Sequence, residues 1–501
     1  MEDLALRGGR VIDGTGTAPF RADVYVTAGR ISGISQGPPM ASADVIDCTG
    51  LIVAPGFIDA HSHSDLQVLD NAPEKMRQGV TFEVVGNCGF SAYPTGERAA
   101  ELHEFANGIL FGDEHWGWRD AKSYLTETKT RCRMGVASLV GHGSLRVAVA
   151  GHRLGRLPQE SVDVMVGMVE QALDDGAVGL STGLMYSPGA SSPLDELDRL
   201  CSVLARRGKL HATHMRDYSD EVCASLREQI GIATRTGCRL QISHFQVVGP
   251  RNWPKHAEAL DILEKAHSDG VDIAFDCYPY TRGSTVMTQL LPQYAMEGGI
   301  SGLLRRLNDP IERKSIAIEM DRTTAQGWSG ILISAIRSSD RQYLVGLSIA
   351  EIAEKSKMEP ASVVLDMLVQ EEGAVNMLEI NQSEENLKST VTHPLSIIIS
   401  DGIYVNGRPH PRLYGTFPYF LGEFCRKRKW LSLEEGIEKI TDKPAQRFGI
   451  KGRGRVKTEY YADLVVFDPD KIHSVATYEN PRVPPTGIYC VLREGKALIR
   501  D

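Results

Sequence analysis

Residues 57–65 read FIDAHSHSD, in which apolar residues come first and polar or ionisable ones follow, and seven later runs share this arrangement. They are TFEVVGNCG (81–89), GVASLVGHGS (135–144), AVGLSTGLM (177–185), KLHATHMRD (209–217), RLQISHFQV (239–247), DIAFDCYPY (272–280) and LSIIISDG (395–402). Intervening segments such as ESVDVMVGMVEQALDDG have the i, i+3, i+4 apolar spacing of amphipathic helices. Eight strand–helix units predict an α/β fold, a (β/α)8 TIM-type barrel that carries its chemistry at the C-terminal ends of the strands.

The two ends of the chain follow another pattern. Residues 4–55 and the tail from Ala462 alternate apolar and polar residues in short runs separated by glycines, which is typical of short antiparallel strands. We expect residues 1–57 and 447–501 to pair into one small β-sandwich domain, with the barrel over 58–446. An insertion at about 283–343 is expected to form either a lid over the barrel mouth or a stabilising excursion without a role in turnover.

The composition is that of a globular protein and excludes disordered and collagenous classes: 501 residues, 42% hydrophobic and 24% charged. The net charge of -9 comes with no basic stripe, so we expect no nucleic-acid partner. The N-terminus lacks the features of a secretory signal and no apolar run is long enough for a membrane span, which predicts a cytoplasmic protein without a membrane partner. The nine cysteines are scattered singly, as expected for reduced thiols.

Several metal-ligating residue types fall at the predicted strand ends. His61 and His63 alternate along the first strand, so their side chains point to the same face. The ends of strands two, five, six and eight add Cys88, His214, His244 and Asp401. Each residue alone has an ordinary interpretation, such as a buried cysteine, a hydrogen-bonded core histidine or a turn aspartate. Together they would meet at one rim of the barrel, where sulfur and imidazole donors favour zinc.

Eight motifs carry a resemblance that spans the chain. They are PGFIDAHSHSD, GVTFEVVGNCGFS, GLSTGLMYSPG, HMRDYSDE, ISHFQVVG, YPYTRGSTV, SDG and HPRLYGTFP. With them the chain resembles the amidohydrolase superfamily and, within it, the N-acyl-D-amino-acid deacylases, or D-aminoacylases. The HxHxD motif at 61–65 indicates the superfamily only. Cys88 is more specific, because dihydroorotase-like and hydantoinase-like relatives use a carboxylated lysine as the bridging ligand, and the strand at 177–185 contains no lysine.

The resemblance implies a metal arrangement and an activity. Cys88, His214 and His244 would bind one zinc tightly. His61, His63 and Asp401 would form a second, weaker site, with Cys88 available to bridge the two. The expected reaction is removal of the acyl group from a small-molecule N-acyl-D-amino acid by metal-activated water, with Asp401 as general base and then general acid.

The substrate's α-carboxylate calls for an arginine, lysine or tyrosine partner. The candidate substrate contacts are Tyr278, Tyr280, Arg282, Arg412 and His142. His142 is equally well interpreted as a packed histidine at the barrel rim, and Arg282 as a solvated loop cation. The family often has a lysine after the histidine of strand six, whereas this chain has Gln246.

Two alternatives stay open. One is a hydrolase of cyclic amides or dipeptides on the same metal site, which the Gln246 departure leaves open. The other is a non-catalytic scaffold, which should have lost metal ligands, although all six expected positions are filled.

Overall fold

An eight-stranded parallel sheet forms the centre of the computed structural model, which describes residues 2–38, 40–112 and 116–500. Its strands are β8 (Phe57–Asp59), β9 (Val80–Val85), β10 (Gly135–Gly141), β11 (Gly179–Gly183), β12 (Leu210–His214), β13 (Arg239–Ile242), β14 (Ile273–Cys277) and β18 (Ser396–Ile398). Neighbours are hydrogen-bonded in the order β18-β14-β13-β12-β11-β10-β9-β8, and a parallel bridge between Ser62 and Gly402 connects the two outer strands. The predicted (β/α)8 barrel is confirmed.

The barrel interior is filled by alternate residues of its strands. Ile58 and Ala60 from the first strand segment pack with Leu210 and Ala212 of β12 and with other strand residues in one buried cluster. Because side chains alternate across a strand, the next inward-facing residue after Ala212 is His214. The apolar half of the strand therefore fills the barrel, and its polar end faces the mouth.

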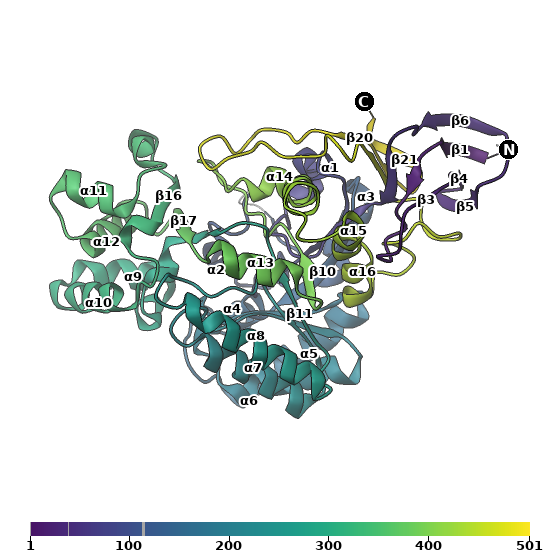
Figure 1. The fold of residues 1–501 in the computed structure, drawn as a ribbon. Helices are drawn as coiled ribbons and strands as arrows, with labels where there is room; N and C mark the ends of the chain where they lie inside the picture. The colour runs from purple at the N-terminus through teal and green to yellow at the C-terminus, as the bar shows by residue number, and fades with distance from the viewer. Residues whose placement is uncertain (1, 39, 113–115, 501) are drawn as a thin grey trace.

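Amphipathic helices cover the outside of the barrel. Among them are α5 (Gln159–Asp174), α6 (Leu194–Arg206), α7 (Val222–Thr236) and α8 (His256–Ser268), which lie together below the sheet in Figure 1. The helix α5 buries Val162, Met165 and Val169 at the expected helical spacing. No helix in the described part of the chain is long and apolar enough to cross a membrane.

Strands from both ends of the chain form two sheets at one side of the barrel (Figure 1). One sheet contains β1 (Glu2–Arg7), β4 (Asp23–Thr27), β5 (Arg30–Ser35) and β6 (Ser42–Asp47). The other contains β2 (Arg10–Val11), β3 (Phe20–Arg21), β7 (Ile52–Pro55), β19 (Leu464–Phe467), β20 (Ile488–Arg493) and β21 (Lys496–Arg500). Leu6 and Val24 of the first sheet share a buried cluster with Val53 and Leu464 of the second, so the sheets form the predicted β-sandwich.

The excursion between β14 and β18 is a compact lobe on the opposite side of the barrel (Figure 1). Its antiparallel sheet has the order β15 (Arg282–Val286), β17 (Val375–Ile380), β16 (Ile331–Ile336). Four helices pack with it: α9 (Gly299–Asn308), α10 (Pro310–Thr323), α11 (Ile349–Ser356) and α12 (Pro360–Gln370). The lobe therefore continues past 343, where the insertion was expected to end, because β17 is the central strand that both other strands need as a partner.

Candidate metal centre and substrate cavity

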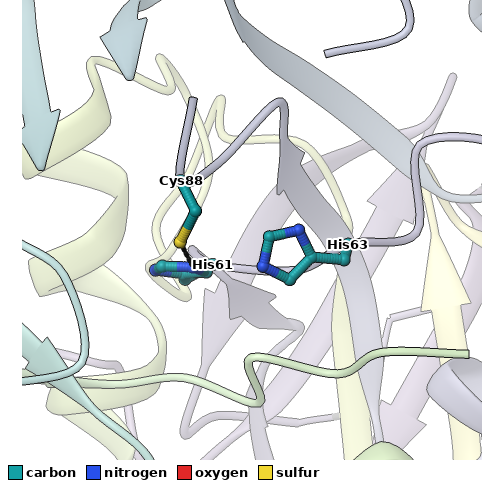
Figure 2. A group of neighbouring side chains, drawn as sticks. All are labelled: His61, His63 and Cys88. Atoms are coloured by element: carbon teal, nitrogen blue, oxygen red, sulfur yellow. Dashed lines mark hydrogen bonds between the residues drawn. The ribbon is translucent and has the colours of Figure 1, made fainter. Parts of the chain in front are cut away.

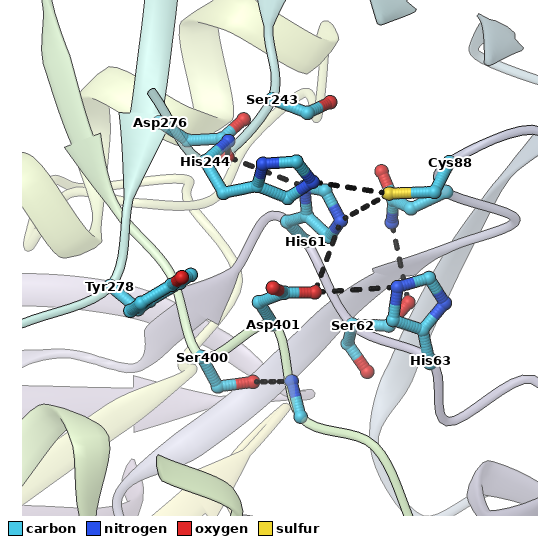
Figure 3. Close-up of polar contacts among 12 residues, drawn as sticks. His61, Ser62, His63, Cys88, Ser243, His244, Asp276, Tyr278, Ser400 and Asp401 are labelled. Carbon is cyan, nitrogen blue, oxygen red and sulfur yellow. Dashed lines mark hydrogen bonds and ion pairs between the residues drawn. The ribbon is translucent and has the colours of Figure 1, made fainter. Parts of the chain in front are cut away.

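Six candidate metal ligands gather at the C-terminal ends of the barrel strands, and Figure 3 labels all of them except His214. They are His61 and His63 after β8, Cys88 after β9, His214 at the end of β12, His244 after β13 and Asp401 after β18. Each residue is at most 6% exposed. The common rim of a parallel barrel thus brings together residues that are up to 340 positions apart in the sequence.

Cys88 lies at the centre of this cluster. Its Sγ is 3.3 Å from His61 Nε2 and 3.5 Å from His244 Nε2. Figure 2 shows the sulfur directly above the His61 ring, with His63 alongside. Two groups of side chains have potential metal-binding atoms that all lie within 4.8 Å of one another. One group is Cys88 with His61 and His63, and the other is Cys88 with His214 and His244. Cys88 is therefore placed to contact a cation in either group.

Asp401 faces two of the histidines and one arginine. Its Oδ1 is 3.4 Å from His61 Nε2 and 3.3 Å from His63 Nε2, and its Oδ2 is 2.9 Å from a terminal nitrogen of Arg412. Burial raises the pKa of the Asp401 carboxyl, but Arg412 and His61 outweigh burial and hold that pKa well below its ordinary value of 3.8. Asp401 is therefore an ionised carboxylate inside a nearly dry site.

The protonation state of His214 and His244 suits a cation. Burial, reinforced by His244, lowers the pKa of His214 well below its ordinary value, and burial lowers the pKa of His244 to about 4. Both ring nitrogens of His214 are buried without a hydrogen-bond partner among the described residues. Metals bind neutral imidazole, so these unpaired nitrogens fit a metal ligand, and the nitrogen, sulfur and carboxylate donors together fit zinc.

The backbone at three of these residues is strained. Cys88, His244 and Asp401 have φ angles of 53°, 34° and 48°, in the left-handed region that non-glycine residues rarely adopt. The loop that carries Cys88 also packs tightly on β11, because a Cβ at Gly183 would collide with the carbonyl oxygen of Cys88. Such strain concentrates at functional sites, where the fold holds side chains in a required orientation.

Asp276 of β14 orients two of the histidines and was not predicted. Its Oδ1 lies 3.3 Å from His61 Nδ1 and accepts the backbone N–H of His244 at 2.7 Å, while its Oδ2 accepts from Gln241 Nε2 at 2.9 Å. Asp276 and the Cys88 sulfur overcome the effect of burial and raise the pKa of His61 well above its ordinary value. The signal for Asp276 was an acidic residue inside the otherwise apolar run at 273–277.

A buried ion cluster ties the first and last strand ends together behind the ligands. Lys75 Nζ donates to Asp59 Oδ2 at 2.6 Å and to Ser400 Oγ at 2.7 Å, and it pairs with Glu83 Oε1 at 3.1 Å. Asp59 precedes His61 by two residues, and Ser400 is next to Asp401. Glu83, for which no role was predicted, therefore belongs to the support of the ligand-bearing loops.

A cavity of about 620 Å³ opens above this cluster. Its wall includes five of the six candidate ligands, all except His61. The lobe formed by β15 to β17 also lines it, with Gln289, Tyr294, Gln326, Glu379 and Asn381. Burial raises the pKa of Glu379 to about 7. The lobe therefore closes one side of the space in which a small molecule would meet the candidate ligands.

Two of the predicted substrate contacts line this cavity, namely Tyr278 and Arg412. The Arg412 guanidinium carbon lies 4.5 Å from the centre of the Tyr278 ring, and Arg412 Nε and Nη1 have no hydrogen-bond partner among the described residues. The Tyr278 hydroxyl donates to Gln246 Oε1 at 2.6 Å and lies 2.8 Å from the Asn381 amide. Gln246 also lines the cavity, at the position where the family often has a lysine.

The other three predicted contacts lie outside the cavity lining. Tyr280 stacks on Tyr419 with ring centres 4.9 Å apart, and Arg282 donates to the carbonyl of Gly330 at 3.2 Å. His142 Nε2 is 2.8 Å from Glu196 Oε1. The structure thus places His142 in a hydrogen-bonded interior pair, Tyr280 in an aromatic stack and Arg282 against the backbone of the lobe.

Known families and structures are similar to this chain over nearly its whole length. The amidohydrolase family matches residues 44–268 and 343–499. The N-acyl-D-glutamate deacylase of Alcaligenes xylosoxydans xylosoxydans is 35% identical over 99% of this chain and 93% of the relative. The crystal structure of N-acyl-D-glutamate deacylase from Bordetella bronchiseptica, with zinc and a phosphonate mimic of the tetrahedral intermediate, has a TM-score of 0.85 and 31% identity, covering 99% of this chain and 96% of that one. A D-aminoacylase structure described by its binuclear metal centre has a TM-score of 0.86 and 30% identity, covering 100% of this chain and 97% of that one.

Proposed function

This chain belongs to the amidohydrolase family and, within it, to the N-acyl-D-amino-acid deacylases, and we propose that it is a zinc-dependent hydrolase that removes the acyl group from N-acyl-D-amino acids. One observation carries the proposal. Cys88 is shared by two groups of buried donors at the wall of a cavity that also contains an ionised carboxylate and an arginine. A linear amide with an α-carboxylate needs these three features together.

The proposed metal ligands divide into the two groups that share Cys88. Cys88, His214 and His244 would hold the tighter cation, because sulfur and two neutral imidazoles form a favourable zinc set. His61, His63 and Asp401 would hold the weaker one. The Asp276 contact to His61 and the pairing of Asp401 with Arg412 support the second set, because each contact restrains one of its members.

Asp401 would move the protons of the reaction. Bound zinc supplies a Lewis acid that polarises the amide carbonyl and acidifies the attacking water. The Asp401 carboxylate, which is ionised and lines the cavity, accepts a proton from that water and returns it to the nitrogen of the departing amine. Because a free amine anion is a very poor leaving group, this return of the proton is what allows the C–N bond to break.

Arg412 would bind the substrate's α-carboxylate, with Tyr278 beside it. Arg412 is fully buried, faces the cavity and keeps two nitrogens free of hydrogen bonds to described residues. A buried guanidinium with free N–H groups is a strong site for a carboxylate. The family often has a lysine at the position of Gln246, which would bind this carboxylate. Because this chain has glutamine there, Arg412 would bind the carboxylate instead. The predicted lid function of the lobe stays a prediction, consistent with its residues in the cavity wall.

The test measures zinc content and amine release on the same preparations. Matched N-acetyl-D- and N-acetyl-L-amino acids with acidic, apolar and basic side chains serve as substrates. Bound zinc with D-selective release is the expected result. Zinc without release from either series would contradict the deacylase assignment and direct the search to cyclic amides and dipeptides, and a protein that binds no zinc would leave the scaffold alternative.

A further inference from the structure

A second cluster of soft donors lies in the barrel wall and consists of Cys201, His211 and Cys238. Cys201 is on α6, His211 is on β12, and Cys238 directly precedes β13. Their ligand atoms all lie within 4.8 Å of one another, and each residue is at most 2% exposed. The reaction proposed above uses none of them.

This wall cluster is separate from the candidate active site. His211 and His214 are three positions apart on β12, so their side chains leave opposite faces of the strand. His214 lines the cavity, whereas His211 faces the helix layer. Cys201 and Cys238 belong to the apolar cluster between the strands and helices such as α5 to α7. A cation here would lie on the far side of the sheet from the substrate.

Hydrogen bonds around His211 fix which of its nitrogens carries a lone pair. Thr182 Oγ1 donates its proton to Thr213 Oγ1 at 2.8 Å, so it accepts from His211 Nε2–H at 3.0 Å. His211 Nδ1 is then the unprotonated nitrogen. It is buried and has no hydrogen-bond partner among the described residues. A buried, unpaired acceptor next to two thiols is unusual in a folded interior and is the kind of donor that a metal ligand provides.

We propose that Cys201, His211 and Cys238 bind one thiophilic divalent cation of the zinc class. Two thiolates and an imidazole are soft donors that select such ions, and zinc sites with three protein ligands complete their tetrahedron with a small molecule such as water. The two thiol protons leave as the cation enters. Two thiolates then balance the charge of the cation, so the dry interior holds no net charge.

Zinc stoichiometry tests the proposal. The protein with its active-site metal in place is loaded with Zn²⁺, freed of loose metal by gel filtration and assayed for zinc per chain. Cys238→Ala should lose one zinc per chain while amine release stays at the wild-type rate. Cys425→Ser, a change at another buried cysteine that belongs to none of the metal-ligating groups, should keep the wild-type zinc content. Equal zinc in wild type and Cys238→Ala overturns the proposal.

A second measurement covers the case in which Cys238→Ala does not fold. Cys88→Ala removes the only sulfur from the active-site donor groups, so X-ray absorption of its zinc should still show two sulfurs at about 2.3 Å and one nitrogen at about 2.0 Å from the wall cluster. Zinc without sulfur neighbours in that variant, or a disulfide between Cys201 and Cys238 in the isolated protein, contradicts the assignment.

Discussion

Replacing Asp401 by asparagine tests the proposed proton transfer with little change in shape. Asparagine keeps an oxygen that can face Arg412, as Asp401 Oδ2 does at 2.9 Å. Its amide nitrogen takes the place of Oδ1, which lies 3.4 Å from His61 Nε2 and 3.3 Å from His63 Nε2, and the amide is not a base. A positioned general acid–base typically contributes about 10² to 10⁴ in rate, which corresponds to about 3 to 5 kcal/mol of transition-state stabilisation. We therefore expect kcat to fall by about 10³ at saturating substrate.

The variant should keep its fold and its tight metal. Arg412 loses a charged partner but retains a hydrogen-bond acceptor, so the free energy of unfolding should fall by only about 1 to 3 kcal/mol. The Cys88, His214 and His244 group is not altered. Amine release, zinc content and thermal unfolding are measured on the same samples.

Asp276→Asn is the matched control. It changes a carboxylate that is equally close to His61 but does not line the cavity. Loss of such a supporting contact typically costs about 10- to 100-fold in metal affinity or activity, so added zinc should restore this variant. Added zinc should not restore Asp401→Asn. If Asp401→Asn with normal zinc content turns over within about tenfold of wild type, Asp401 is not the proton-transfer group.

Three further substitutions test other contacts. Arg412→Lys should raise KM for N-acyl amino acids by about one to two orders of magnitude, because lysine cannot reproduce a two-pronged contact to a carboxylate; an unchanged KM would remove Arg412 from substrate binding. His142→Ala should lower the free energy of unfolding in urea by about 1 to 3 kcal/mol, because it removes one hydrogen bond from the buried Glu196 carboxylate, and should leave kcat and KM unchanged; a raised KM would restore the predicted substrate contact. Burial raises the pKa of Glu379 from 4.5 to about 7, so the folded chain holds a proton that the unfolded chain releases, and stability is lost as pH rises from 4.5 through 7. Glu379→Gln should therefore raise the free energy of unfolding at pH 8 by up to about 3 kcal/mol and have little effect below pH 4.5, and an equal effect at both pH values would contradict this reasoning.

The amino-acid sequence alone determined the barrel and the gathering of the six candidate ligands. Apolar periodicity predicts each strand and helix from a short local stretch of sequence. In a closed parallel barrel, the C-terminal ends of all strands lie at the same rim. A residue at the end of a predicted strand is thereby assigned to that rim without knowledge of packing. This is why His61 and Asp401, 340 residues apart, could be expected to meet.

Only the tertiary structure decided which loop residues face the cavity. Tyr278 and Tyr280 are two residues apart, yet one lines the cavity and the other stacks on Tyr419. Outside regular strands no period fixes the direction of a side chain, so long-range packing of the lobe settles it. Asp276 and the wall cluster at Cys201 lie on or next to regular elements, but their partners come from other strands and helices. A contact between distant segments leaves no local pattern in the sequence.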